Sequence, residues 1–146
     1  MSRLFSLQEA RALLPFVGRT LREAVEARER HEAAEQFLQG LAQRILLMGG
    51  ISVNTAAVES WKHQLETSGK IISGALSKIE EAGVVVKDLN VGLVDFPTMF
   101  RGEEVYLCWR MDEDDISHWH GIHEGFAGRR EIDSNFIDNH RGTGLT

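Results

Sequence analysis

The sequence of 146 residues has a single cysteine, Cys108, and no apolar run long enough to cross a bilayer. One thiol cannot form an internal disulfide, which is typical of a protein that works in a reducing compartment. A transmembrane helix needs about 20 predominantly apolar residues, so we expect no membrane span. The first residues, Met1 to Ser6, contain no apolar core of the kind found in secretory signals. We therefore expect a cytoplasmic protein.

Basic residues are also scarce. The chain has 16 lysines and arginines against 22 aspartates and glutamates, which gives a net charge of −6. Residues 83–146 hold 12 of these acidic side chains and 6 of the basic ones. Neutralising a phosphate backbone requires clustered lysine and arginine, so nucleic acid is not expected as a partner. Nor is a membrane expected, since the chain lacks an apolar segment long enough to span one. An acidic segment that contains histidines suits a cation instead.

The chain contains two prolines, Pro15 and Pro97, and its first half is predicted to form two long helices. Ser6 and Glu9 fit a capping box, in which each side chain satisfies a free amide at the start of a helix. Apolar residues then recur every three or four positions as far as Gly49-Gly50, which is expected to end the helix.

The second helix is predicted to begin near Asn54 or Thr55 and to extend to residue 82. Its apolar residues form a seam with nearly heptad spacing, namely Val58, Trp61, Leu65, Gly69, Ile72, Leu76 and Ile79. A glycine on such a seam suggests the close approach of another backbone. Two helices of this length exceed what the rest of the chain can cover, so we expect a homo-oligomer, with a dimer as the first hypothesis. Leu65, Gly69 and Ile72 are the predicted helical interface.

The remainder of the chain is predicted to be β-structure. Residues 84–89, 92–96 and 104–110 are rich in β-branched and aromatic side chains and predict about three antiparallel strands, with residues 97–102 as a hairpin connection. Met99 and Phe100 at that hairpin tip would be exposed on a monomer, which indicates an intermolecular contact. The predicted fold is a single α+β domain over residues 1–146. It consists of a helical hairpin (1–82), a small sheet with loops (83–138) and a frayed tail (139–146).

The densest group of potential metal ligands is His118, His120, His123 and Glu124. Alternate residues of a strand share a face, so His118 and His120 could meet one ion. A turn at Gly121 could then return His123 or Glu124 as a third ligand. Three such ligands with an open fourth position make a catalytic zinc site, which activates water. The alternative is that His118 and His123 are surface residues and His120 is hydrogen-bonded within the structure.

Three other residues are candidates for chemistry. Asp95 interrupts an apolar strand and could be a general base, a metal ligand or a cap for the turn at Pro97, with Arg110 or Arg129 as its partner. Cys108 lacks the neighbours of a nucleophile and is predicted to be a buried strand residue. Arg129, in the glycine-rich segment 125–130, either binds a small anion or pairs with a carboxylate in a tight turn.

Across nearly its whole length the sequence resembles a bacterial family known as domain of unknown function 2203. The resemblance rests on residues 5–15, 86–89, 92–97, 107–110, 119–120 and 125–129. It implies a small cytosolic bacterial protein and brings no established reaction, cofactor or catalytic residue. Because Trp119-His120 fits the family pattern and His118 does not, the resemblance leaves Asp95, His120 and Arg129 as the shared polar set.

Two functions are compatible with these observations. The first is a non-enzymatic oligomeric interaction or regulatory module, which the long helices and the lack of a complete catalytic motif favour. The second is a metal-dependent hydrolase with His120 as the central ligand and zinc as the first candidate metal. Neither hypothesis identifies a small-molecule ligand.

Overall fold

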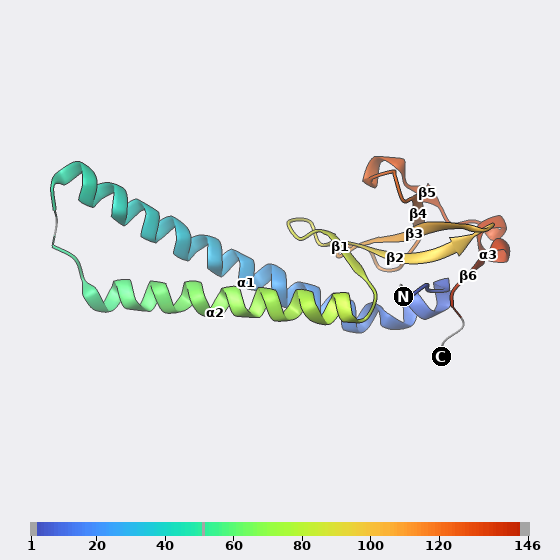
Figure 1. Cartoon of the computed structure of the whole chain (residues 1–146), viewed down its shortest axis with the longest axis horizontal. Helices are drawn as coiled ribbons and strands as arrows, with labels where there is room; N and C mark the ends of the chain where they lie inside the picture. Colours follow the sequence, from blue (N-terminus) through green and yellow to red (C-terminus); the bar gives the residue numbers. More distant parts are fainter. Residues whose placement is uncertain (1–2, 51, 144–146) are drawn as a thin grey trace. The chain divides into compact units, whose positions relative to one another are not determined.

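The computed structural model describes residues 3–50 and 52–143, and it confirms an α+β fold in which long helices precede an antiparallel sheet (Figure 1). The sheet has six strands instead of the three expected. The elements are α1 (Leu7–Met48), α2 (Thr55–Glu81), β1 (Val85–Asp88), β2 (Leu93–Phe100), β3 (Glu103–Arg110), β4 (His118–Gly121), the 3-10 helix η1 (Phe126–Gly128), β5 (Arg130–Glu131), α3 (Ser134–Asn139) and β6 (His140–Arg141).

The chain divides into two compact units. One unit contains Met1–Arg22 and Leu76–Thr146, and the other is Glu23–Ala75. The start of α1 and the end of α2 therefore belong to the same unit as the sheet.

The sheet has the strand order β1-β2-β3-β4-β5, and β6 also pairs with β2. One edge of β2 is shared by two partners. β1 pairs with Leu93–Asp95 and β6 pairs with Met99–Phe100, both antiparallel. The other edge of β2 pairs with the whole of β3.

The hairpin between β2 and β3 has a two-residue turn, Arg101-Gly102, and not the longer connection expected over residues 97–102. Both residues have positive φ, 51° and 85°, which is the requirement of the tight turns that join twisted antiparallel strands. Pro97 is consequently a strand residue that lies opposite Tyr106. Its carbonyl accepts a hydrogen bond from the Phe5 amide (2.6 Å), so its nitrogen also faces away from β3 and its missing N–H removes no bond of that ladder.

One face of the sheet, which includes Leu107 and Trp109, packs on the start of α1. The Phe5 and Phe96 rings meet edge to face at 5.4 Å, and the Trp109 ring contacts α1 at Gly18. The buried residues of this core are Phe5, Leu7, Ala10, Val17, Leu21, Ile79, Val84, Val94, Phe96, Val105, Leu107, Trp109, Ile116 and Phe136.

The predicted helix ends are confirmed. The Ser6 amide donates to Glu9 Oε1 (2.9 Å) and the Glu9 amide donates to Ser6 Oγ (3.1 Å), which is the reciprocal capping box. At the start of α2, Asn54 Oδ1 accepts from the Ala57 amide (3.0 Å). α1 ends at Met48 before the two glycines, and Gly83 has the positive φ of 92° that follows a helix stop.

The C-terminal segment is structured through residue 143, in contrast to the predicted frayed tail; residues 144–146 lie outside the described part. Asp133 caps α3, and β6 pairs with β2. His140 connects this segment to α1, because its Nε2 accepts a hydrogen bond from the Leu7 amide (2.9 Å).

Met99 and Phe100 are half-buried, so the exposure from which we predicted a contact between copies is absent. The Phe100 ring stacks on Phe136 of α3 at 4.8 Å and packs against Trp119 at 5.0 Å. The partner of Phe100 is therefore a helix of its own chain, which was not expected from the sequence.

In the unit Glu23–Ala75, small side chains lie between the two helices. Ala27, Ala34, Ser68 and Ala75 are buried there, and the Phe37 and Trp61 rings stack at 4.9 Å. A Cβ on Gly69 would lie 3.7 Å from the His31 imidazole, an ordinary contact. Within the chain, Gly69 thus faces the His31 side chain and not another backbone. No helix in the described ranges is long and apolar enough to cross a membrane.

The stacking of Phe136 predicts that Phe136→Ala lowers the free energy of unfolding by about 3–5 kcal/mol, measured by urea denaturation. The reason is the loss of the ring that Phe100 and Trp119 contact. Ile137→Ala is the matched control, because the Ile137 side chain is 48% exposed and its removal should change stability by no more than about 0.5 kcal/mol. Equal losses in the two variants would contradict this account of the C-terminal segment.

Candidate functional site

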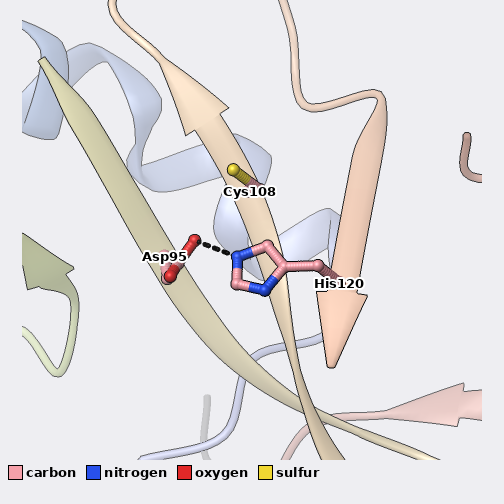
Figure 2. A group of neighbouring side chains, drawn as sticks. All are labelled: Asp95, Cys108 and His120. Carbon is pink, nitrogen blue, oxygen red and sulfur yellow. Dashed lines mark hydrogen bonds and ion pairs between the residues drawn. The ribbon is translucent and has the colours of Figure 1, made fainter. Parts of the chain in front are cut away.

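Three buried polar side chains meet on the face of the sheet opposite the α1 core. Asp95 comes from β2, Cys108 from β3 and His120 from β4, and Asp95 lies directly opposite Cys108 in the strand register. His120 lies opposite Tyr106, two residues before Cys108, and so projects from the same face. Figure 2 shows these side chains converging from three neighbouring strands.

Asp95 and His120 form a buried pair. His120 Nε2 lies 3.0 Å from Asp95 Oδ1, and the two side chains are 3% and 0% exposed. The other ring nitrogen of His120, Nδ1, is 2.8 Å from the Gly121 carbonyl oxygen. A carbonyl oxygen can only accept, so Nδ1 carries a proton and donates it in this bond. The partner of Asp95 is thus His120, not Arg110 or Arg129 as expected.

Burial controls the electrostatics of Asp95. Removal of water from around the carboxylate raises its pKa above the usual range, while the charge and hydrogen bond of His120 and the charge of Lys87 act in the opposite direction. Asp95 Oδ2 has no hydrogen-bond partner among the described residues. A buried carboxylate with one unsatisfied oxygen is costly, which marks this position as a site that needs an explanation.

Cys108 is fully buried, as predicted, and its thiol is the third member of the group. Burial, followed by the nearby Asp95 charge, raises the pKa of the thiol to about 12. Such a thiol is not a nucleophile at neutral pH. The potential ligand atoms of Asp95, Cys108 and His120 all lie within 4.8 Å of one another, so this group could hold a metal ion.

Arg129 belongs to a separate ion pair. Its Nη2 donates to both carboxylate oxygens of Glu113 at 2.7 and 2.8 Å, and its side chain is 10% exposed. The structure thus favours the carboxylate pairing for Arg129 over the binding of a small anion. The family resemblance indicated a polar set of Asp95, His120 and Arg129. The structure brings together only Asp95 and His120 of these three.

The four predicted metal ligands do not converge. His118 Nδ1 faces Glu113 at 3.8 Å, and His123 is exposed. Glu124 accepts a hydrogen bond from the Gly121 amide (2.9 Å) and pairs with Arg130. Of the four, His120 alone belongs to the buried group, and the residue that sequence reasoning missed as its companion is Cys108. The sequence Arg101-Gly102 could have indicated this neighbour. A two-residue turn at these positions sets a strand register in which Asp95 lies opposite Cys108.

Comparison with known proteins gives a family but no activity. The model of the family described as "Uncharacterized conserved protein (DUF2203)" matches residues 3–132. The chain belongs to the DUF2203 family. No curated protein matches it, and no solved structure matches it either. Membership therefore confirms the resemblance without assigning a reaction to the Asp95–Cys108–His120 group.

The buried pair predicts that His120→Ala lowers the free energy of unfolding by about 3–5 kcal/mol, because the Asp95 carboxylate is left buried without a partner. Chemical denaturation of His120→Ala, Asp95→Ala and the double variant measures the coupling between the two side chains. The losses should not add, since either single change removes the same interaction. His123→Ala is the exposed control and should leave stability unchanged; additive losses at positions 95 and 120 would refute the pairing.

The raised pKa and burial of Cys108 predict that its thiol resists modification in the folded protein. Ellman's reagent at about pH 8 should react with Cys108 only after the protein is unfolded, because the thiolate is scarce and inaccessible in the native state. Since the chain has one cysteine, the released chromophore reports this residue alone. Rapid stoichiometric reaction of the native protein would show that the thiol is accessible or ionised.

Proposed function

We propose that the protein is a non-enzymatic interaction module that associates with a second copy through the end of its helical hairpin. The supporting observation is a cluster of apolar side chains at the end of α1 that the chain leaves exposed. Leu46, Leu47 and Met48 are 82%, 86% and 67% exposed, and Ile45 and Val53 are also exposed. Contiguous exposed apolar surface of this kind marks an interaction site.

The exposed residues are consecutive, and this decides what kind of partner fits them. Four successive positions of a helix point in different directions around its axis, so one neighbouring helix cannot cover Ile45, Leu46, Leu47 and Met48 together. A partner must therefore contact the helix end from more than one side. We define the hairpin tip as residues 45–48 and 53.

A second copy of the chain suits the hairpin tip for an electrostatic reason. Between residues 41 and 58 the sequence contains one charged side chain, Arg44. Two identical surfaces that meet about a two-fold axis bring copies of the same side chain close together near that axis, which costs little where charge is scarce. The half-buried residues Leu65 and Ile72 remain a predicted extension of this interface, with Gly69 between them.

A metal-dependent hydrolase is the second candidate, because the Asp95–Cys108–His120 group could hold an ion such as zinc. A hydrolase also needs a route for substrate to the metal. Cavities of about 730, 520, 480 and 240 Å³ open on the described part of the chain, and none of these four is lined by Asp95, Cys108 or His120. The geometry therefore favours the interaction module.

Self-association predicts that the double change Leu46→Glu and Leu47→Glu converts the protein from a dimer to a monomer. The reason is that charge repulsion and lost apolar contact would act at the same interface. Light scattering coupled to size-exclusion chromatography measures the mass. Val91→Glu is the matched control, since Val91 is an exposed apolar residue of the other unit and should leave the mass unchanged. A monomeric parent protein, or a charged double variant that keeps the parent's mass, would contradict the proposal.

A further inference from the structure

The geometry around His120 requires a proton or a metal ion between two acceptors. Because Nδ1 donates to the Gly121 carbonyl, Nε2 of the neutral ring presents a lone pair. That lone pair faces Asp95 Oδ1, itself an acceptor, at 3.0 Å. Two acceptors at this distance repel each other unless a proton or a metal ion lies between them.

Two further donor atoms are available at the same place. Asp95 Oδ2 is unpartnered within the described residues, although the Asp95 side chain is fully buried. The Cys108 sulfur adds a soft donor, and one atom from each of the three side chains lies within 4.8 Å of the others. A proton shared by Asp95 and His120 satisfies only the contact between them, whereas a metal ion can bind one atom from each of the three side chains.

We infer that Asp95, Cys108 and His120 are the protein ligands of one buried zinc ion. This inference goes beyond the proposed function and is independent of how the hairpin tip assembles. Zinc binding would displace the Cys108 thiol proton and the proton shared by Asp95 and His120, and both protons would leave to solvent. The resulting carboxylate and thiolate carry two negative charges, which neutralise a divalent ion at a buried place where an unbalanced charge would be costly.

The spacing of the three side chains suits a tetrahedral ion. With zinc bonds of about 2.0–2.3 Å, two ligand atoms of a tetrahedral site lie about 3.3–3.6 Å apart. The present separations, 3.0 Å for nitrogen to oxygen and at most 4.8 Å for any pair, bracket that range. The fourth position is left to a water molecule or to Asp95 Oδ2.

The surroundings of His120 are also those of a metal-binding histidine. A metal-binding histidine commonly donates its second ring N–H to a backbone carbonyl or carboxylate, which fixes the ring and the tautomer. The Gly121 carbonyl does this for Nδ1 of His120. A mixed set of thiolate, imidazole and carboxylate favours zinc over magnesium or calcium, which prefer oxygen ligands. Because the group is buried, the ion would enter as the chain folds, and binding would add to stability.

Cobalt(II) provides the test, because it substitutes for zinc and reports a thiolate ligand by its charge-transfer absorption. The full-length protein is unfolded with reductant and chelator, then refolded with cobalt(II) alone, and its cobalt content is measured by mass spectrometry. We expect stoichiometric cobalt, a thiolate-to-cobalt absorption band that zinc abolishes, and a higher melting temperature than in the chelator-treated protein. A refolded protein without cobalt would overturn the inference and leave the shared proton as the explanation of the contact.

Variants separate the buried group from the surface histidines. Cys108→Ser should lose the charge-transfer band, and His120→Gln should lose bound cobalt. The matched control is His118→Gln, because His118 projects from the same face of β4 and lies opposite Cys108 in the register, yet is outside the group. It should keep both signals. If Cys108→Ser fails to fold, Cys108→Ala gives the same comparison with a small apolar side chain. A charge-transfer band that persists in both cysteine variants, or cobalt that is lost in His118→Gln, would overturn the assignment.

Discussion

The pairing of Asp95 with His120 is the interaction on which the arrangement of the sheet depends. Asp95 lies in the strand β2, whose first six residues are all buried. A carboxylate without water must be matched by hydrogen bonds or positive charge, or its burial costs several kcal/mol. Its partner comes from β4, two strands away, so β3 must lie between them in a register that lets the two side chains meet across it.

The turn Arg101-Gly102 supplies that register. A two-residue turn leaves no freedom in how β2 and β3 align, since a shift of one residue would move Asp95 to the apolar face. With the turn in place, Asp95 lies opposite Cys108, and β4 then brings His120 onto the same face. The polar group is therefore a consequence of local turn chemistry combined with alternation along three strands.

Those parts of the fold that depend on local signals could be predicted from the sequence. The capping box of Ser6 and Glu9 and the glycines after Met48 act within a few residues, and both helix boundaries follow from them. The short strands β5 and β6 have two residues each, which is too few for a periodic pattern, and they exist because distant strands pair with them.

The residues of the candidate site could likewise be predicted only in part. Asp95 was recognisable because it is a carboxylate in an apolar strand, and His120 because it lies in a segment dense in potential metal ligands. Their pairing was not predicted, because the connection expected over residues 97–102 implies a different register of β2 against β3. For the same reason Cys108, whose local sequence is that of an ordinary buried strand residue, was not recognised as a member of the group. Arg129 was one possible partner of Asp95 but pairs with Glu113, a residue that was not among the candidates.

Burying the polar side chains of Asp95, Cys108 and His120 costs free energy, and this cost needs an explanation. Buried polar and ionic groups can often be replaced by well-packed apolar residues without loss of stability, so packing alone does not require them. Here three such side chains come from three strands, and one carboxylate oxygen still lacks a partner in the described structure. An arrangement that only supported the sheet would gain by satisfying or removing that oxygen. An arrangement that receives an ion needs a carboxylate oxygen, the imidazole lone pair and the thiol close together, and one such atom from each of the three side chains lies within 4.8 Å of the others.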